Sequence, residues 1–226
     1  MTVEFQGSLL DLADAETDGP EQTRVGPLAG PVSANTGSAN TVRRDELTRG
    51  AWVDVRPGWL TRAADLFARL VDEVPWRAER REMYDRVVDV PRLLCFYGEE
   101  DVLPDPVLEQ GRDQLTGYYR RELGEAFVTA GLCLYRDGRD SVAWHGDTTG
   151  RGSTEDTMVA IVSLGSPRAL TLRPRGAGPA RRYELGHGDL IVMGGSCQRT
   201  WEHAVPKTAR PTGPRISVQF RPRGVR

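Results

Sequence analysis

Apolar residues recur at helical spacing in two stretches of the first half of the chain. In the first stretch Thr61 is a candidate cap, apolar positions follow at intervals of three and four residues, and Pro75 ends the pattern. In the second stretch Asp105 is the candidate cap, Pro106 occupies the first turn, and the apolar stripe continues to Leu123. We expect two helices there, and since neither carries an obvious chemical group, we expect them to brace a sheet.

From Phe127 onward the pattern changes to short runs rich in β-branched and aromatic residues, separated by glycine or proline. The expected strands are Phe127–Arg136, Thr157–Leu164, Ala169–Arg173, Ala180–Leu185, Asp189–Met193 and Arg215–Arg221. Helices followed by many strands indicate an α+β domain whose second half is a jelly roll or a barrel.

Residues 1–45 contain many turn formers and few core candidates, above all between Gly26 and Ser38. We expect a weakly structured extension over residues 1–45 and one domain over residues 46–226. No apolar run approaches the roughly 20 residues that cross a bilayer. The N-terminus also lacks the basic start and apolar stretch of a signal peptide. These features predict a cytoplasmic protein with no membrane partner.

Composition adds little to this picture. The formal net charge of −2 gives no overall attraction for nucleic acid, but arginines crowd the C-terminal half. A basic face and an ordinary solvated surface both remain open interpretations. The three cysteines are odd in number and widely spaced, so we expect reduced thiols. No obligate protein partner is evident.

Two of the three histidines fall in a pattern that suits a metal ion. His145 and Asp147 are two residues apart, which places both on one face of an extended strand, and His203 follows 58 positions after His145. Two imidazoles and one carboxylate can hold Fe(II) and leave the opposite side of the ion open. A hydrolytic zinc site and a surface aspartate beside two buried histidines remain alternatives.

The two faces of the last expected strand differ in polarity. The polar face consists of Arg215, Ser217, Gln219 and Arg221, and the apolar face of Ile216, Val218 and Phe220. An arginine that points into a cavity needs an anion, and guanidinium matches a carboxylate with two parallel hydrogen bonds. An arginine pair that faces solvent on an edge strand is the alternative.

Five segments together resemble the AlkB-type iron(II) and 2-oxoglutarate-dependent dioxygenases in their order and spacing. They are Val90–Gly98, Tyr135–Asp147, Leu185–Met193, Trp201–Pro206 and Arg215–Arg221. The resemblance extends from about Trp52 to Arg223 and is closest from Leu132 onward. It implies a double-stranded β-helix (jelly-roll) core braced by the N-terminal helices.

The resemblance also implies a role for individual residues. The expected Fe(II) ligands are His145, Asp147 and His203. Arg215 is expected to pair with the distal carboxylate of 2-oxoglutarate with help from Tyr135, and Arg221 to lie near the chelating end. In the same comparison His187 is structural, and Trp201 and Met193 are packing residues.

The activity that this family implies consumes O2 and 2-oxoglutarate and hydroxylates a C–H bond. On an N-methyl group the product breaks down to formaldehyde and the free amine. The chain is therefore expected to dealkylate N-alkylated nucleobases in DNA or RNA, with alkylated nucleic acid as its partner. The same chemistry on a small molecule or a protein side chain is one alternative, and a non-catalytic metal-binding β-barrel is another.

The chain departs from the family pattern near the substrate. Cys133 replaces a common asparagine, and Thr148 and Thr149 replace acidic residues that help to read the damaged base. The stacking aromatics that usually follow Tyr97-Gly98 are replaced by the acidic segment Glu99–Leu103. Bases that react outside the duplex are stacked in a pocket. The candidate substrate-pocket residues are Tyr97, Thr148 and Thr149. Phe96 and Trp144 are further candidates for stacking a base, but for these two we favour the alternative that they pack in the core.

Overall fold

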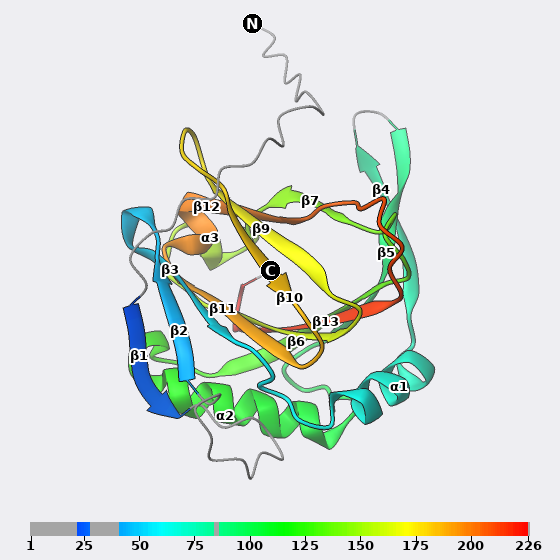
Figure 1. Ribbon diagram of the computed structural model, residues 1–226, viewed down its shortest axis with the longest axis horizontal. Coiled ribbons are helices and arrows are strands. Elements are labelled where there is room, and N and C mark those ends of the chain that lie inside the picture. Colours follow the sequence, from blue (N-terminus) through cyan, green and yellow to red (C-terminus); the bar gives the residue numbers. More distant parts are fainter. Residues whose placement is uncertain (1–21, 28–40, 84–85, 226) are drawn as a thin grey trace, which may run out of the picture.

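The computed structural model describes residues 22–27, 41–83 and 86–225, whose strands form two antiparallel sheets (Figure 1). The larger sheet has nine strands. In spatial order they are β1 (Gln22–Pro27), β2 (Thr41–Glu46), β3 (Ala51–Arg56), β11 (Asp189–Gly195), β8 (Val159–Gly165), β13 (Arg215–Pro222), β6 (Phe127–Tyr135), β5 (Arg86–Tyr97) and β4 (Arg77–Met83). The smaller sheet has four strands. In spatial order they are β10 (Arg181–Leu185), β9 (Arg168–Pro174), β12 (Trp201–Val205) and β7 (Val142–His145).

The two sheets bury an apolar core between them. Val53 and Ile161 enter this core from the larger sheet, and Leu172 and Tyr183 enter it from the smaller one. Alternate residues of a strand point to opposite faces. The larger sheet therefore supplies a second core on its outer face, away from the smaller sheet.

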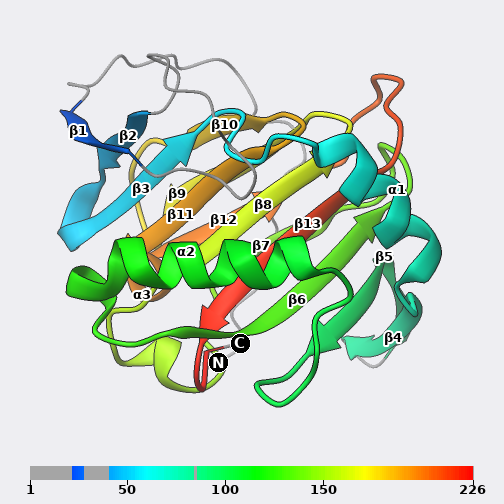
Figure 2. The ribbon, with the colours of Figure 1, turned by 90° about the horizontal axis from the view of Figure 1, so that it is seen from below.

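Helices α1 (Ala63–Glu73) and α2 (Pro106–Leu123) cover that outer face (Figure 2). Their side chains buried in the second core include Leu66, Leu70, Leu115 and Tyr119. The remaining short helical segments are Thr48–Gly50, Arg151–Ser153 and α3 (Cys197–Thr200). None of the helices described is long and apolar enough to cross a membrane.

The two predicted helices are both present, but only one of the predicted caps is correct. Asp105 precedes α2 and its Oδ1 accepts a hydrogen bond from the backbone nitrogen of Val107 at 2.9 Å, as expected of an N-cap. Helix α1 begins after Arg62, one residue later than a cap at Thr61 implies, and its N-cap residue Arg62 makes no side-chain capping bond. Burial of the apolar stripe, rather than a cap, stabilises this helix end.

The six strands predicted from Phe127 onward are confirmed to within two residues at each end. The strands β4 and β5 were not expected. They form an antiparallel hairpin at the edge of the larger sheet, and β5 pairs with β6. Charged residues dominate β4, so its pairing with β5 is set by the neighbouring strand and not by an apolar pattern of its own.

Two strands also lie inside the segment that the sequence predicts to be weakly structured. β1 pairs with β2, and β2 pairs with β3. Arg44 of β2 is buried and forms two hydrogen bonds to the carboxylate of Asp54 on β3, at 2.6 and 2.7 Å. The expectation is therefore wrong for residues 22–27 and 41–45, while the other residues of the segment lie outside the described part of the chain.

Candidate metal centre

The three predicted ligands come together where β7 and β12 pair. His145 and His203 lie directly opposite each other in the register of these strands, and their ring centroids are 4.2 Å apart. Asp147 follows two residues after β7. One ligand atom from each of the three residues lies within 4.8 Å of the other two. Among the described residues this is the one group of its kind that fits a metal ion.

The ring of His145 is oriented by its own strand. Its Nδ1 lies 2.9 Å from the carbonyl oxygen of Ala143, and a carbonyl oxygen only accepts hydrogen bonds. Nδ1 therefore carries the hydrogen, and the lone pair is on Nε2, which lies 3.7 Å from Asp147 Oδ1. This tautomer is the one that binds a metal through Nε2.

Asp147 is buried, and burial alone would raise the pKa of its carboxyl group. The positive charge of Arg221 and the neighbouring His203 outweigh burial, so the pKa lies well below its ordinary value. Arg221 Nε donates to Asp147 Oδ2 at 2.8 Å. Asp147 is therefore ionised at neutral pH, as a metal ligand must be.

His203 is buried as well. Burial and the proximity of His145 lower the pKa of His203 to about 3, so its imidazole is neutral at neutral pH. The side chain of His145 is 40% exposed and that of Asp147 only 5%. The centre is therefore open to solvent on the side of His145.

Gly146, between the two ligands, packs against α3. A Cβ atom at this position would lie 2.5 Å from the backbone oxygen of Gln198 and 2.9 Å from Arg175 NH2. The side chain of Gln198 accepts a hydrogen bond from the backbone nitrogen of Asp147 at 2.9 Å. The absence of a side chain at Gly146 thus lets α3 support the backbone of the centre, a contact that sequence reasoning missed.

A buried arginine lies on β13, at the opposite end of the strand from Arg221. Arg215 is 1% exposed, its Nε donates to Ser163 Oγ at 2.9 Å, and its guanidinium carbon lies 5.1 Å from the ring centroid of Tyr135. Its NH1 has no hydrogen-bond partner among the described residues. Burial lowers the pKa of Arg215, and the nearby groups that shift it are Tyr135, Arg168 and Cys133, with no carboxylate among them.

The predicted division of β13 into two faces is confirmed. Ile216, Val218 and Phe220 are fully buried in the core beneath the helices. On the inner face, Gln219 connects the polar residues. Its amide nitrogen donates to Ser217 Oγ at 2.9 Å and reaches Cys133 Sγ at 3.4 Å, while its oxygen accepts from Arg221 NH2 at 2.7 Å. Cys133 is therefore a member of this polar chain.

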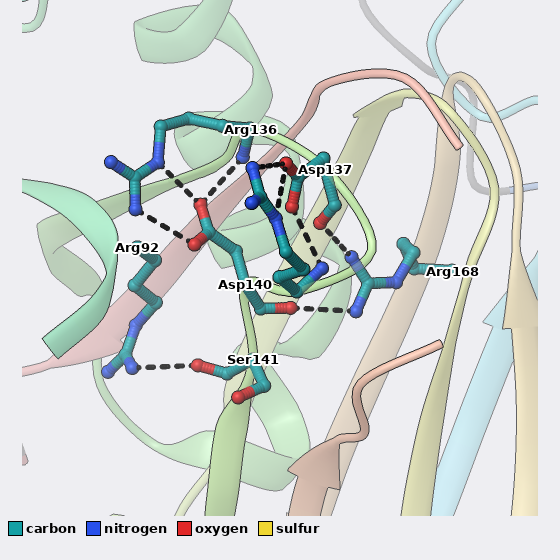
Figure 3. Close-up of polar contacts among 7 residues, drawn as sticks. Arg92, Arg136, Asp137, Asp140, Ser141 and Arg168 are labelled. Atoms are coloured by element: carbon teal, nitrogen blue, oxygen red, sulfur yellow. Dashed lines mark hydrogen bonds and ion pairs between the residues drawn. The ribbon is translucent and has the colours of Figure 1, made fainter. Parts of the chain in front are cut away.

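Arg168, at the start of β9, anchors the loop between β6 and β7 (Figure 3). Its NH1 donates to the carbonyl oxygen of Asp137 at 2.9 Å, and its NH2 donates to those of Asp140 and Pro206, each at 2.8 Å. The guanidinium carbon also lies 5.7 Å from the ring centroid of Tyr135. The sequence suggested Arg168 only as part of a surface group of arginines, but the residue is 3% exposed.

The favoured expectations for the two aromatic residues of β5 do not hold in the structure. Tyr97 packs against the core beneath the helices, and burial raises the pKa of its hydroxyl. Phe96 is 47% exposed. Tyr97 therefore does not line the metal side of the sheet, and Phe96 is not a core residue. Trp144 is partly buried, with the guanidinium carbon of Arg173 4.4 Å from its ring centroid.

Thr148 and Thr149 directly follow the metal-site aspartate. The backbone nitrogen of Thr148 donates to the carbonyl oxygen of Gly146 at 2.8 Å, and Thr149 is exposed. The assignment of both threonines to a substrate pocket remains a prediction.

The other histidine and two packing residues lie where the sequence places them. His187 is exposed, and its Nδ1 accepts a hydrogen bond from the backbone nitrogen of Gly165 at 2.8 Å, so it is outside the metal group. Trp201 and Met193 are buried in the core between the sheets.

Charged residues around the site are largely paired with one another. Arg223 forms an ion pair with Glu99 of the acidic segment, and Asp101 of the same segment accepts a hydrogen bond from the backbone nitrogen of Gly98 at 2.7 Å. Arg173 and Arg175 both bind Glu202, at 3.0 and 3.2 Å. The suspected basic face is therefore partly neutralised on the smaller sheet.

The donor set fits Fe(II) together with a dicarboxylate. Two neutral imidazoles and one ionised carboxylate match the ligand type of non-haem iron. Arg215 is the independent observation, because a buried guanidinium with an unpartnered NH1 is costly unless an anion pairs with it. Both features lie on the inner faces of the two sheets.

Comparison with known proteins agrees with this chemistry. Alpha-ketoglutarate-dependent dioxygenase alkB homolog 3 of Bos taurus is 31% identical over 186 residues, covering 73% of this chain and 64% of that protein. DNA oxidative demethylase ALKBH2 of Homo sapiens is 28% identical over 182 residues, covering 70% of this chain and 68% of that protein. The chain thus spans less than two thirds of the length of the bovine relative.

Solved structures show the same fold at low sequence identity. The structure of OsALKBH1 has a TM-score of 0.56 at 13% identity and covers 79% of this chain and 99% of that one. An oxidoreductase of the 2OG-Fe(II) oxygenase family from Burkholderia pseudomallei has a TM-score of 0.52 at 14% identity. This match covers 76% of this chain and 86% of that one. Residues 54–221 match the model of the family described as the 2OG-Fe(II) oxygenase superfamily. This match includes the three metal-site residues and both β13 arginines, and the chain belongs to the 2OG-Fe(II) oxygenase superfamily.

Proposed function

We propose that this chain is an iron(II)- and 2-oxoglutarate-dependent dioxygenase that removes alkyl groups from N-alkylated nucleobases in nucleic acid. The observation that carries the proposal is that one protein interior holds both a group of three potential metal ligands (His145, Asp147 and His203) and the buried Arg215, on facing sheets. Similarity to an alkB homolog and to a DNA oxidative demethylase supports the choice of substrate.

Each residue then has a role that follows from its contacts. Arg221 keeps Asp147 ionised, and Ala143 fixes the tautomer of His145. Arg215, with Tyr135 beside it, receives the distal carboxylate of 2-oxoglutarate. Bound Fe(II) and 2-oxoglutarate supply the oxidation, with O2, of a substrate C–H bond to an alcohol.

The proposal also includes the type of β-fold that the two sheets form. We infer that the two facing antiparallel sheets are a double-stranded β-helix, a reading supported by the solved structures of similar fold. The dioxygenase domain would then comprise residues 46–226 together with β2, which pairs with β3. A cytoplasmic location remains a prediction.

The proposal is tested by incubating the protein with Fe(II), ascorbate, 2-oxoglutarate and oligonucleotides that carry N-methylated bases. We expect succinate and formaldehyde in equal amounts. His145→Ala removes a ligand and abolishes both products, whereas His187→Ala removes a histidine outside the group and leaves them unchanged. Succinate without formaldehyde rejects dealkylation but not oxygenation. Metal binding without any 2-oxoglutarate consumption favours a non-catalytic barrel.

A small molecule or a protein side chain is the second candidate substrate. The observation in its favour is that Glu202 and Glu99 neutralise arginines that a phosphate backbone would use. A panel of metabolites and peptides, assayed beside methylated single- and double-stranded DNA, distinguishes the two. Formaldehyde released only from DNA rejects this candidate.

A further inference from the structure

Asp147 and the arginine that binds it belong to different sheets. Asp147 follows β7 of the smaller sheet, whereas Arg221 lies near the end of β13 in the larger sheet. Arg221 Nε nevertheless donates to Asp147 Oδ2 at 2.8 Å. Since N–H···O hydrogen bonds span only about 2.7 to 3.2 Å, a small shift of either sheet breaks this contact. The contact therefore depends on what holds the segment after Asp147 to the end of β13.

The backbone joins these two segments directly. Gly150 forms an isolated antiparallel bridge with Val225, and the backbone nitrogen of Arg151 donates to the carbonyl oxygen of Gly224 at 3.1 Å. A Cβ atom at Gly150 would lie 2.1 Å from that same carbonyl oxygen. The residues after β13 are thus in close contact with the segment that follows the metal-site aspartate.

The side chain of Arg151 strengthens this junction. Its Nε donates to the carbonyl oxygen of Arg223 at 2.8 Å, two residues after Arg221. Its terminal nitrogens form ion pairs with Glu155, at 3.1 Å, and with Glu125, two residues before β6. β6 is a direct neighbour of β13 in the larger sheet. One guanidinium therefore joins the segment after the metal-site aspartate to the end of β13 and the start of β6.

The same segment packs against Asp147 itself. A Cβ atom at Gly152 would lie 2.1 Å from the backbone oxygen of Asp147 and 3.6 Å from Val225 Cγ1. Val225 is buried in the core between the sheets. Because these groups are in close contact, a shift of Arg151 away from the end of β13 displaces Gly152 and the backbone of Asp147.

We infer that Arg151 is a positioning residue for the metal centre. It holds the segment after Asp147 to the end of β13, so that the guanidinium of Arg221 stays on the carboxylate. Groups that orient a metal ligand in this way contribute to metal affinity without binding the ion. This inference rests on the metal centre of the proposed function and is independent of the choice of substrate.

The test is calorimetric titration of the metal-free protein with Mn(II). We expect Arg151→Met to raise the Kd about 10-fold, the lower end of the effect of groups that orient metal ligands. The direction is informative, because loss of a positive charge near the site would by itself strengthen the binding of a cation. Arg62→Met, which removes an exposed arginine paired with Asp65 at 2.8 Å, is the matched control and should bind like wild type.

The absorption spectrum of bound Co(II) distinguishes positioning from a general loss of stability. The visible bands of Co(II) depend on the number and geometry of its ligands. At saturating Co(II), we expect the bands of Arg151→Met to differ from those of wild type, and those of Arg62→Met to be unchanged. The side chain of Arg151 is 32% exposed, so we expect the variant to fold, which circular dichroism checks.

The separate results identify which claim fails. If wild type does not bind Mn(II), the metal centre and the positioning role are both overturned. If wild type binds Mn(II) and Arg151→Met binds it equally well or more tightly, the positioning role is overturned and the proposed function stands. Weaker binding together with an unchanged Co(II) spectrum also overturns the positioning role, because lower stability alone would give that result.

Discussion

At the scale of single residues, the metal centre depends on two glycines as well as on the side chains that could bind the metal. Gly146 and Gly131 each leave space for a neighbouring group, α3 in one case and Arg221 in the other. In a protein interior packed as densely as an organic crystal, such a space cannot take an additional methyl group without movement.

Gly146→Ala tests this requirement. Its Cβ would lie 2.5 Å from the Gln198 backbone oxygen, so β7 or α3 must move and Asp147 moves with it. We expect the affinity for Mn(II), measured by isothermal titration calorimetry, to fall about 10- to 100-fold. Gly117→Ala is the matched control, since nothing lies within 4 Å of its Cβ position. A Gly146→Ala protein that binds Mn(II) like wild type would show that the close packing of Gly146 against α3 does not support the metal site.

The sequence predicted the residues of the site better than their surroundings. His145, Asp147 and Arg215 belong to short patterns whose spacing is visible in the chain. Which of Phe96 and Tyr97 packs beneath the helices was not predictable, because a shift of one residue along a strand reverses the face of every side chain. Only pairing with β6 determines which of the two faces the metal side.

At the scale of elements, Arg168 joins the parts that carry the functional groups. The loop that it binds connects Tyr135 on β6 to β7, and Pro206 directly follows β12, which carries His203. One guanidinium thus fixes the ends of three strands that belong to two sheets. Nothing in the local sequence shows this, because the acceptors are backbone carbonyls 28 to 38 residues away.

Arg168→Met removes these three hydrogen bonds and leaves their carbonyl oxygens without this partner. We expect the free energy of unfolding, measured by urea denaturation, to fall by about 3 kcal/mol, given roughly 1 kcal/mol or more for each bond to a charged donor. Arg139→Met, in the same loop with a side chain 90% exposed, should change it by less than about 1 kcal/mol. Equal losses in the two variants would show that Arg168 does not anchor the loop.

Prediction of elements succeeded where the local pattern agrees with the final pairing. The strands from Phe127 onward alternate or form short apolar runs between turn residues, and they lie where expected. β4 and β2 are rich in charged residues, so their strand structure comes from pairing with a neighbour. Such tertiary effects are outside the reach of local patterns.

At the scale of the whole molecule, one buried ionic network holds β2, β3 and α2 together. Arg44 binds Asp54 with two hydrogen bonds and Glu122 with two more, at 3.1 and 3.2 Å, and Tyr119 donates to Asp54 Oδ2 at 2.9 Å. The guanidinium carbon also lies 3.6 Å from the centroid of the Trp52 ring. Through Arg44, this network attaches strand β2 (residues 41–46) to the rest of the folded domain.

Arg44→Met leaves the carboxylate of Asp54 buried without its cation. We expect the free energy of unfolding to fall by about 3–5 kcal/mol in urea denaturation. Arg43→Met, at an exposed ion pair of 3.8 Å with Asp45, is the adjacent control and should change it by less than about 1 kcal/mol. A loss for Arg44→Met as small as that of the control would show that the ionic network of Arg44 contributes little to stability.

The central claim is that the metal group and Arg215 bind opposite ends of one dicarboxylate. The direct measurement is calorimetric binding of 2-oxoglutarate and of 2-oxobutanoate, which lacks the distal carboxylate, to the Mn(II)-loaded protein. We expect wild type to prefer 2-oxoglutarate by at least roughly 30-fold, because a buried charge pair is lost with the shorter acid. Arg215→Met should remove this preference. Equal affinities in wild type, or a preference that survives in Arg215→Met, would contradict this claim.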